Sequence, residues 1–276
     1  MTVTTERLAE AIDRLDLAGR AVMAHTSLRS FGERVEGGPD AILDALLDQG
    51  CTVLVPSFSE PQFGVAPPPG LRPSRNALDY ASPFAIPDAP PAVYTVDCGV
   101  VNAGMGALPA RLVAREGARR GHHPLNSFAA LGPDASALVG AQAPDDVYAP
   151  IRALVERDGA ILQIGVGLDR MTALHYAEQL SGRRLFVRWA LRPDGEVCAV
   201  EVGSCSEGFP RLAPYLRART ATVAASRWNA YEARATVDAA VAALTADQTI
   251  TRCADPNCLR CEDSIAGGPI GPVALG

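Results

Sequence analysis

Apolar residues recur along this chain in two spacings. Where they stand three or four residues apart, as at Leu8, Ile12 and Leu15, they predict the buried face of an amphipathic helix. Where a short β-branched run stands between two glycines, as at residues 160–164, it predicts a buried strand. The predicted helices cover residues 3–17, 39–49, 150–158, 171–180, 209–217 and 231–244, and the predicted strands cover residues 20–24, 51–56, 160–164, 185–191 and 197–202.

The order of these elements predicts an α/β fold. The first two strands are joined by a helix, which is the arrangement of a parallel βαβ unit. The last two strands flank a strong turn sequence at residues 192–195 and are therefore expected to pair as an antiparallel hairpin. We expect a mixed sheet flanked by helices, in a single domain that covers residues 1–276.

Residues 57–91 interrupt the periodic pattern. Long loops in compact domains are usually lids or binding segments, so we expect this proline-rich loop to face a substrate. The alternative is a surface insertion without regular structure. The prolines stand at positions 61, 67, 68, 69, 73, 83, 87, 90 and 91.

The composition is that of a globular chain with a mild acidic excess. Of the 276 residues 48% are hydrophobic, and no stretch approaches the ~18 unbroken apolar residues of a membrane span. The N-terminal segment lacks the apolar centre of a signal peptide, so we expect a cytoplasmic protein. The net charge is −6 and all 25 basic residues are arginine, which argues against a nucleic-acid partner and favours cationic small molecules.

The stretch at residues 165–178 has the features of a site. It begins at the glycine that ends the predicted strand 160–164 and continues into a helix, and ligands gather at such strand ends in α/β folds. His175 and Glu178 are three residues apart on this helix and share one face. We expect a functional base and acid here, with a purely structural imidazole–carboxylate pair as the alternative.

Two further polar segments carry candidate chemistry. Residues 25–28, His-Thr-Ser-Leu, follow the first predicted strand directly. The loop at 119–128 concentrates two arginines, two histidines and a serine around a glycine, a composition suited to binding anions. A solvated basic turn is the alternative for this loop.

The segments 25–32, 119–132 and 162–178, with 104–109 between the first two, together resemble the aminoglycoside N3-acetyltransferase family. The resemblance spans roughly residues 5–265. It implies the α/β fold of that antibiotic N-acetyltransferase family rather than the GNAT fold. It also implies transfer of an acetyl group from acetyl-coenzyme A to the 3-amino group of an aminoglycoside, with resistance to the antibiotic as the outcome.

The resemblance implies catalytic roles for three residues. His175 resembles the general base that removes a proton from the attacking amine. Glu207 resembles the carboxylate that orients and polarises this base. Glu178 matches an acidic position on the same helix. The chemistry agrees, because the amine must be neutral to attack a thioester and an imidazole accepts protons near neutral pH. Backbone N–H groups around Thr26 and Ser27 are candidate donors to the developing oxyanion.

The resemblance also implies binding residues. Phosphate contacts are expected in the loop at 119–127, although a role in bracing this loop is equally open for His123, and the pantetheine arm is expected near Ser27. The expected coenzyme A contacts are Thr26, Ser27, Leu28, Arg119, Arg120, His122, His123 and Ser127. Aminoglycosides are polycations, so carboxylates should line the cleft, and the candidates are Asp79, Asp97, Asp145, Asp146 and Glu207. A homodimer is one possible assembly.

The C-terminal tail at 253–261 is rich in cysteine. Cys258 and Cys261 form a CxxC pair and Cys253 lies five residues upstream of it, while Cys205 matches a cysteine of some family members. Four thiolates suit a closed structural Zn²⁺ site, which would staple the tail to the wall of the active site. An incidental or redox-active CxxC is the alternative.

Two other functions remain open. The same acetyl transfer can act on a different amine in natural-product biosynthesis, which the unusual loop at 57–91 would suit. A zinc-stapled protein of the same fold can also bind a ligand without turnover, although the intact His175 and Glu207 argue against this.

Overall fold

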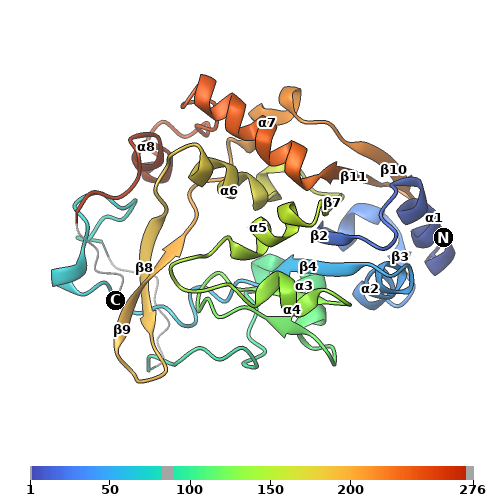
Figure 1. The fold of residues 1–276 in the computed structure, drawn as a ribbon, viewed down its shortest axis with the longest axis horizontal. Helices are drawn as coiled ribbons and strands as arrows, with labels where there is room; N and C mark the ends of the chain where they lie inside the picture. Colours follow the sequence, from blue (N-terminus) through green and yellow to red (C-terminus); the bar gives the residue numbers. More distant parts are fainter. Residues whose placement is uncertain (1, 83–89, 272–276) are drawn as a thin grey trace.

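The computed structural model describes residues 2–82 and 90–271, so residues 83–89 of the proline-rich loop, with two of its prolines, lie outside the described residues. A seven-stranded sheet forms the centre of the described chain (Figure 1). Its strands are β2 (Ala21–Thr26), β4 (Thr52–Pro56), β5 (Arg119–Arg120), β6 (Phe128–Leu131), β7 (Ala160–Ile164), β10 (Arg219–Val223) and β11 (Ser226–Glu232). Their order across the sheet is β10-β11-β7-β2-β4-β6-β5.

The sheet is parallel at its centre and antiparallel at both edges. Strand β2 pairs in parallel with β4 on one side and with β7 on the other. Strands β11, β10, β6 and β5 each run antiparallel to the neighbour that they extend. The helix α2 (Pro39–Asp48) connects β2 to β4, which confirms the predicted βαβ unit and the mixed sheet.

Successive residues of a strand point to opposite faces of the sheet, and here both sets are apolar. Helices therefore cover both faces. Val22 and Leu162 belong to the core under α1, α2 and α3, whereas Met23 and Ile161 belong to the core under α4 to α7. Each such side chain contributes about 1.5–3 kcal/mol through its burial. The other helix bounds are α1 (Thr5–Arg14), α3 (Ala107–Val113), α4 (Ala135–Val139), α5 (Ala149–Glu156), α6 (Ala173–Leu180) and α7 (Ala233–Ala246).

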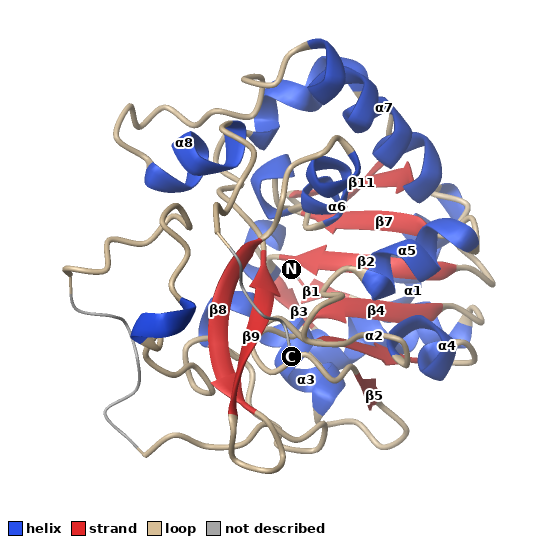
Figure 2. Ribbon diagram, turned by 60° about the vertical axis from the view of Figure 1, so that its left-hand side comes forward, coloured by secondary structure: helices blue, strands red, loops and turns tan. Residues whose placement is uncertain are grey.

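The predicted hairpin is present and lies beyond the carboxyl ends of the parallel strands. It consists of β8 (Phe186–Leu191) and β9 (Val197–Val202), which pair along their whole length. Figure 2 shows it standing across the end of the sheet toward which β7 and β2 point. It therefore forms a wall near the strand ends, where ligands gather.

The described part of the proline-rich loop packs against this hairpin. The Val65 N–H donates to the Trp189 carbonyl at 2.9 Å, and the Asn76 side chain exchanges two hydrogen bonds with the Val187 backbone at 2.9 and 2.8 Å. Arg75 in turn donates from Nε to the Gly268 carbonyl at 2.7 Å. The described loop is thus a packed cover of the hairpin, tied to the C-terminal segment, rather than a disordered insertion.

Two predicted helices differ from the structure. The last one begins at Ala233 rather than Tyr231, because Tyr231 and Glu232 complete strand β11 and pair with β7. The segment at 209–217 is a 3₁₀ helix, Phe209–Tyr215, and Pro214 inside it lacks the N–H group that a regular α-helix would use. The remaining short elements are β1 (Thr2–Val3), β3 (Arg34–Val35), α8 (Leu259–Ile265) and the 3₁₀ turns Leu28–Phe31, Pro69–Leu71, Ala103–Met105 and Leu168–Arg170.

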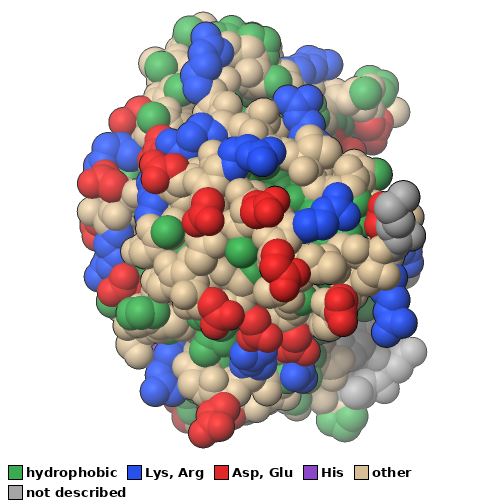
Figure 3. Space-filling view, turned by 90° about the vertical axis from the view of Figure 1, so that its right-hand side faces the viewer, with side chains coloured by type: hydrophobic (Ala, Val, Ile, Leu, Met, Phe, Trp, Pro, Cys, Tyr) green, Lys and Arg blue, Asp and Glu red, His purple; other side chains and the backbone are tan. Residues whose placement is uncertain are grey.

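The surface carries charges of both signs. Figure 3 shows acidic and arginine side chains interspersed on the face that includes α1, α2 and β10. Asp40 accepts hydrogen bonds there from Arg111 at 2.7 Å and from Arg115 at 2.8 Å. Such exposed pairs contribute about 0–1 kcal/mol each. Among the described helices, none has the length and apolarity needed to cross a bilayer.

Candidate active site

A cleft of about 860 Å³ opens where the three parallel strands end. Its lining comes from segments 24–29 after β2, 56–58 after β4, 103–109 and 165–175 after β7, with Ser206 from the turn after β9. Clefts of this size are typical of small-molecule sites. The cleft therefore lies where the strand order predicts it. The proline-rich loop contributes Phe58 to its wall, whereas Val65, Leu71, Leu78 and Tyr80 of the same loop pack against the hairpin.

Gly165 brings the loops after β2 and β7 together. Its φ is +63°, and a Cβ added there would lie 1.9 Å from the Ser30 hydroxyl oxygen. The Ser27 N–H donates to the Ile164 carbonyl at 2.9 Å, and the Ser30 hydroxyl donates to the Ser27 carbonyl at 2.6 Å. Only glycine fits both the left-handed backbone and the close contact, so this residue fixes the floor of the cleft.

His175 and Glu178 form the pair that their spacing on α6 predicts. His175 lines the cleft, and its Nδ1 lies 2.8 Å from Oε2 of Glu178, which is 3% exposed. An ionised carboxylate only accepts hydrogen bonds, so Nδ1 carries the proton and Nε2 keeps a free lone pair. The imidazole is therefore arranged as a base.

Two aromatic rings confine the imidazole. The ring centroid of Phe209 lies 4.7 Å from that of His175, and the Tyr148 ring is parallel to it within 8° at 6.3 Å. Gly203 passes between these groups: an added Cβ would lie 2.4 Å from the Tyr148 hydroxyl and 3.2 Å from the imidazole ring. A side chain at position 203 would therefore collide with Tyr148 and crowd His175, so only glycine fits here.

The charge of Glu178 is maintained despite its burial. Burial raises the pKa of this carboxyl, but its hydrogen bonds with His175 and Ser204 and the charge of Arg183 act against burial, and the pKa lies below its ordinary value. The Arg183 guanidinium is 5% exposed and donates directly to Glu178 Oε1. A buried charge paired in this way remains a dependable acceptor for Nδ1.

Glu207 is exposed in the turn after β9, and the carboxylate that is hydrogen-bonded to the imidazole is that of Glu178. This contact follows from the three-residue spacing of His175 and Glu178 on one helix.

The buried donors of the loop at 119–128 are hydrogen-bonded within the protein. Arg120 is buried and donates to the Ser57 carbonyl at 2.7 Å, the Val100 carbonyl at 2.6 Å and the Ser127 hydroxyl at 3.0 Å. Its guanidinium also lies 5.3 Å from the Tyr94 ring centroid. The N–H groups of Arg120 that we expected to bind phosphate are therefore engaged in these hydrogen bonds. Arg120 and Ser127 thus stabilise the loop.

His123 braces the same loop. Its Nδ1 accepts from the Asn126 N–H at 2.8 Å, and its Nε2 donates to the Glu201 carbonyl at 2.8 Å. Arg119 and His122 are exposed and lie outside the described lining of the cleft. The alternative of a bracing role is thus the one that the His123 contacts support.

The charged groups in the cleft differ from those expected. Asp79, Asp97, Asp145 and Asp146 lie outside its described lining, and Asp146 is paired with Arg152 at 2.5 Å. The lining instead contains Asp169, Arg29 and Arg170. Sequence reasoning passed over these three although they stand inside the segments 25–32 and 165–178, whose position at strand ends was the available signal.

His25 is a buried histidine on the cleft wall. It is 8% exposed, and its Nε2 has no hydrogen-bond partner among the described residues. Burial lowers the pKa of His25 to about 4, so the ring is neutral at pH 7. Burial likewise lowers the pKa of His123 to about 4.

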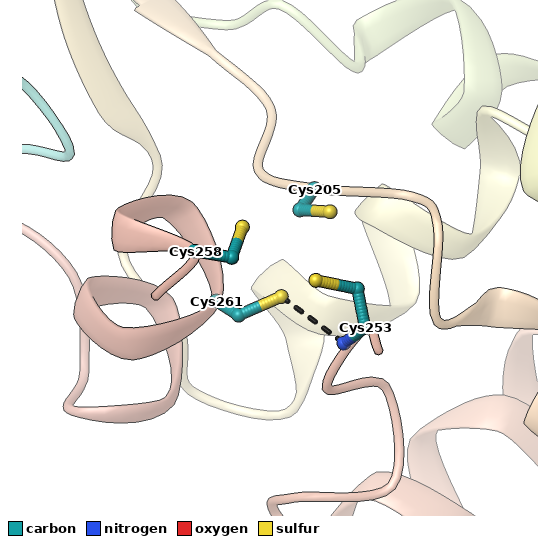
Figure 4. A group of neighbouring side chains, drawn as sticks. All are labelled: Cys205, Cys253, Cys258 and Cys261. Carbon is teal, nitrogen blue, oxygen red and sulfur yellow. Dashed lines mark hydrogen bonds between the residues drawn. The ribbon is translucent and has the colours of Figure 1, made fainter. Parts of the chain in front are cut away.

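Four cysteines meet between the turn after β9 and the C-terminal tail, as the sequence predicted. The sulfur atoms of Cys205, Cys253, Cys258 and Cys261 all lie within 4.8 Å of one another, and their side chains converge in Figure 4. Tetrahedral zinc with Zn–S bonds of ~2.3 Å requires sulfur separations of ~3.8 Å, which this arrangement approaches. Burial raises the pKa of Cys205 to about 11, and repulsion from the Cys258 and Cys253 thiolates adds to it, so a set of thiolates here calls for a cation.

Comparison with known sequences gives one consistent family. A family model described as aminoglycoside 3-N-acetyltransferase matches residues 23–245. Aminoglycoside N(3)-acetyltransferase VII of Streptomyces paromomycinus is 33% identical over 187 residues, which cover 65% of this chain and 61% of the relative. Aminoglycoside N(3)-acetyltransferase IX of Micromonospora chalcea is 34% identical over 194 residues, which cover 66% of this chain and 64% of the relative. The chain thus spans somewhat over 60% of the length of these relatives.

Solved structures agree with the sequence comparison. The crystal structure of aminoglycoside acetyltransferase AAC(3)-IVa, an apoenzyme, superposes with a TM-score of 0.76 over 97% of this chain and 98% of that one, at 21% identity. The AAC-IIIb binary complex with CoASH superposes with a TM-score of 0.71 over 88% of this chain and 97% of that one, at 25% identity. These matches confirm the predicted fold and its distinction from the GNAT fold.

The space taken by Gly203 leads to a first prediction. Replacing Gly203 with alanine forces Tyr148 or His175 to move, so we expect a loss of about 1–3 kcal/mol of stability. Gly70→Ala is the control, because a Cβ at Gly70 meets nothing within 4 Å. Urea unfolding of both variants measures the difference, and equal stability would contradict the clamped arrangement.

The buried histidines lead to a second prediction. The pKa values of His25 and His123 are about 4 in the folded protein, against about 6.5 for free histidine. Between these values the unfolded chain binds more protons, so stability is full above pH 7 and falls as the pH drops toward 4, by roughly 3 kcal/mol per histidine. We expect the NMR signals of both rings to stay in the neutral form at pH 5, and titration near pH 6.5 would show that the rings are hydrated.

Proposed function

The chain belongs to the aminoglycoside 3-N-acetyltransferase family, and from this premise we propose that it transfers an acetyl group from acetyl-coenzyme A to an amino group of an aminoglycoside. The observation that carries the proposal is the His175–Glu178 pair on the wall of the cleft. The named relatives support the reaction class, and the AAC-IIIb complex with CoASH supports coenzyme A as the carrier. Resistance follows chemically, because an acetylated amine no longer takes up a proton at neutral pH.

His175 acts as the general base in this proposal. Nε2 accepts a proton from the amine as its nitrogen attacks the thioester carbon, and Glu178 stabilises the imidazolium that forms. The carbon–sulfur bond then breaks, the amide remains on the acceptor, and the thiolate takes up the proton from His175 directly or through solvent. Tyr148 and Phe209 pack beside the ring and limit its movement.

The residues after β2 hold the reacting end of acetyl-coenzyme A in this proposal. Thr26, Ser27 and Leu28 line the cleft opposite the segment that carries His175. The backbone N–H of Ser27 is already bonded to the Ile164 carbonyl, so it does not serve the oxyanion. We assign that role to the hydroxyls of Thr26 and Ser27, since both residues line the cleft.

Arg29 and Arg170 are the proposed phosphate contacts. Both line the cleft, unlike the arginines of the loop at 119–128. Arginine pairs with phosphate oxygens through two parallel N–H groups, which suits the pyrophosphate and 3′-phosphate of coenzyme A. Asp169 is the proposed contact for a positively charged group of the acceptor.

A different amine is the second candidate acceptor, and one observation favours it. Among the described residues that line the cleft, Asp169 provides the only carboxylate. A polycation is expected to recruit several carboxylates, so an acceptor with fewer positive charges also fits. The third hypothesis is a protein that binds a ligand without turnover. The intact His175–Glu178 pair argues against it.

We also propose a structural Zn²⁺ in the four-cysteine cluster. The donor set fits, because Cys205, Cys253, Cys258 and Cys261 supply four sulfur ligands and leave no position for a water or substrate. When bound, the ion would neutralise the thiolates and join the C-terminal segment to the turn after β9. It takes no part in the acetyl transfer.

Substitution of the pair gives a third prediction. We expect His175→Ala to lower kcat by ~10²–10⁴-fold, as is typical for loss of a general base. Glu178→Gln removes a charged hydrogen bond and is expected to lower kcat by roughly 10–100-fold. Glu207→Gln is the matched comparison and is expected to stay within about twofold, because surface substitutions of this kind change little.

The measurement is release of the coenzyme A thiol with a panel of aminoglycosides and simpler amines. A large loss in Glu207→Gln with an unchanged Glu178→Gln would assign the orienting role to Glu207. Turnover with simpler amines alone would favour the second acceptor class. No thiol release with any amine would refute the proposed function.

Metal analysis gives a fourth prediction. We expect about one zinc ion per purified chain and less than about a tenth of that in Cys258→Ser, because loss of one of four ligands opens a structural site. Cys198→Ser is the control, since Cys198 is buried in the hairpin outside the cluster. Zinc absent from the wild-type chain after expression with added zinc would contradict the assignment.

A further inference from the structure

Glu178 is held by four hydrogen-bond donors, two on each oxygen. Oε2 accepts from His175 Nδ1 at 2.8 Å and from the Ser204 hydroxyl at 2.7 Å. Oε1 accepts from the Thr251 hydroxyl at 3.1 Å and from Arg183 Nη1. Rotation of the carboxylate would break bonds on both oxygens at once, so its plane is fixed and with it the direction of the imidazole.

Arg183 also sets the direction of the Thr251 hydroxyl. Its Nη1 donates to the Thr251 oxygen at 2.9 Å, and its Nη2 donates to the Gln248 carbonyl at 2.5 Å. Because the Thr251 oxygen accepts from the guanidinium, its own proton points toward Glu178. Arg183 therefore anchors the segment that precedes the cysteine tail.

The two hydroxyls stand on the segments that the cysteine cluster joins. Ser204 directly precedes Cys205, and Thr251 lies two residues before Cys253. The two segments also touch, because a Cβ at Gly208 would lie 2.0 Å from the Thr251 carbonyl oxygen. Any movement between them shifts Ser204 relative to Thr251, and Glu178 bridges the two.

We infer that Ser204, Thr251 and Arg183 are positioning residues for His175, and that the four-cysteine cluster fixes two of them by holding their segments together. The cluster thereby couples the binding of its metal to the orientation of the base. The effect on turnover rests on the proposed function, whereas the effect on the His175–Glu178 hydrogen bond does not.

The kinetic test separates positioning from substrate binding. We expect Ser204→Ala and Thr251→Val each to lower kcat roughly 10-fold, the loss of one hydrogen bond to a charged group, with KM within about twofold. The conservative variants Ser204→Thr and Thr251→Ser keep the hydroxyl and are expected to recover kcat to within about threefold of wild type. A rise in KM with unchanged kcat would overturn the positioning role.

The spectroscopic test needs no turnover. The proton on His175 Nδ1, hydrogen-bonded to Glu178, should give a downfield NMR signal that is absent in His175→Gln. We expect this signal to be lost or broadened in the Ser204→Ala/Thr251→Val double variant and in Cys258→Ser, and retained in Cys198→Ala. Circular dichroism establishes that each variant is folded, and the Ser204→Ala single variant replaces the double variant if the latter is not.

The two arms distinguish the possible failures. An unchanged signal in the double variant would overturn the inference about Ser204 and Thr251. An unchanged signal and kcat in metal-free Cys258→Ser would overturn the coupling to the cluster. If wild type releases no thiol with any amine but the signal behaves as expected, the proposed function fails while the positioning network stands.

Discussion

The buried carboxylate of Glu178 is the constraint on which the site depends. A charge that is removed from water must be fully hydrogen-bonded, and it is strongly destabilising if one partner is lost. Its partners come from α6, from the turn after β9 and from the segment after α7, which are far apart in the sequence. The need to hydrogen-bond one buried carboxylate therefore fixes the positions of three separate parts of the chain around His175.

The sheet provides the frame for this arrangement. Three neighbouring parallel strands end at the same edge, and the loops that follow them supply most of the cleft wall. Gly165 and Gly203 lie where two such segments approach each other more closely than any side chain allows. The hairpin closes the open end, and the proline-rich loop covers it in turn.

Much of this was predictable from local pattern. The parallel centre of the sheet followed from buried apolar runs, and the pairing of His175 with Glu178 from their spacing on one helix. The grouping of Cys205 with the tail cysteines followed from a resemblance, and the structure confirms it. Strands β10 and β11 were missed because their exposed positions carry arginine, threonine and asparagine in a short run beside a helix. The contacts of Arg120 could not be predicted, because composition cannot show whether a polar donor faces solvent or buried carbonyl groups, and Arg120 faces carbonyl groups.

The bond from Arg75 to the Gly268 carbonyl has a consequence for the order in which the molecule is assembled. The two residues are separated by 193 positions, and the backbone of Arg75 also pairs with Ile270. The cover precedes the hairpin in the sequence, whereas Gly268 and Ile270 follow it. Contacts between residues so far apart form slowly, because a long loop must close first. Until they form, the cover rests on the hairpin without its tie to the C-terminal segment, so this strand pair is more open to association with other chains.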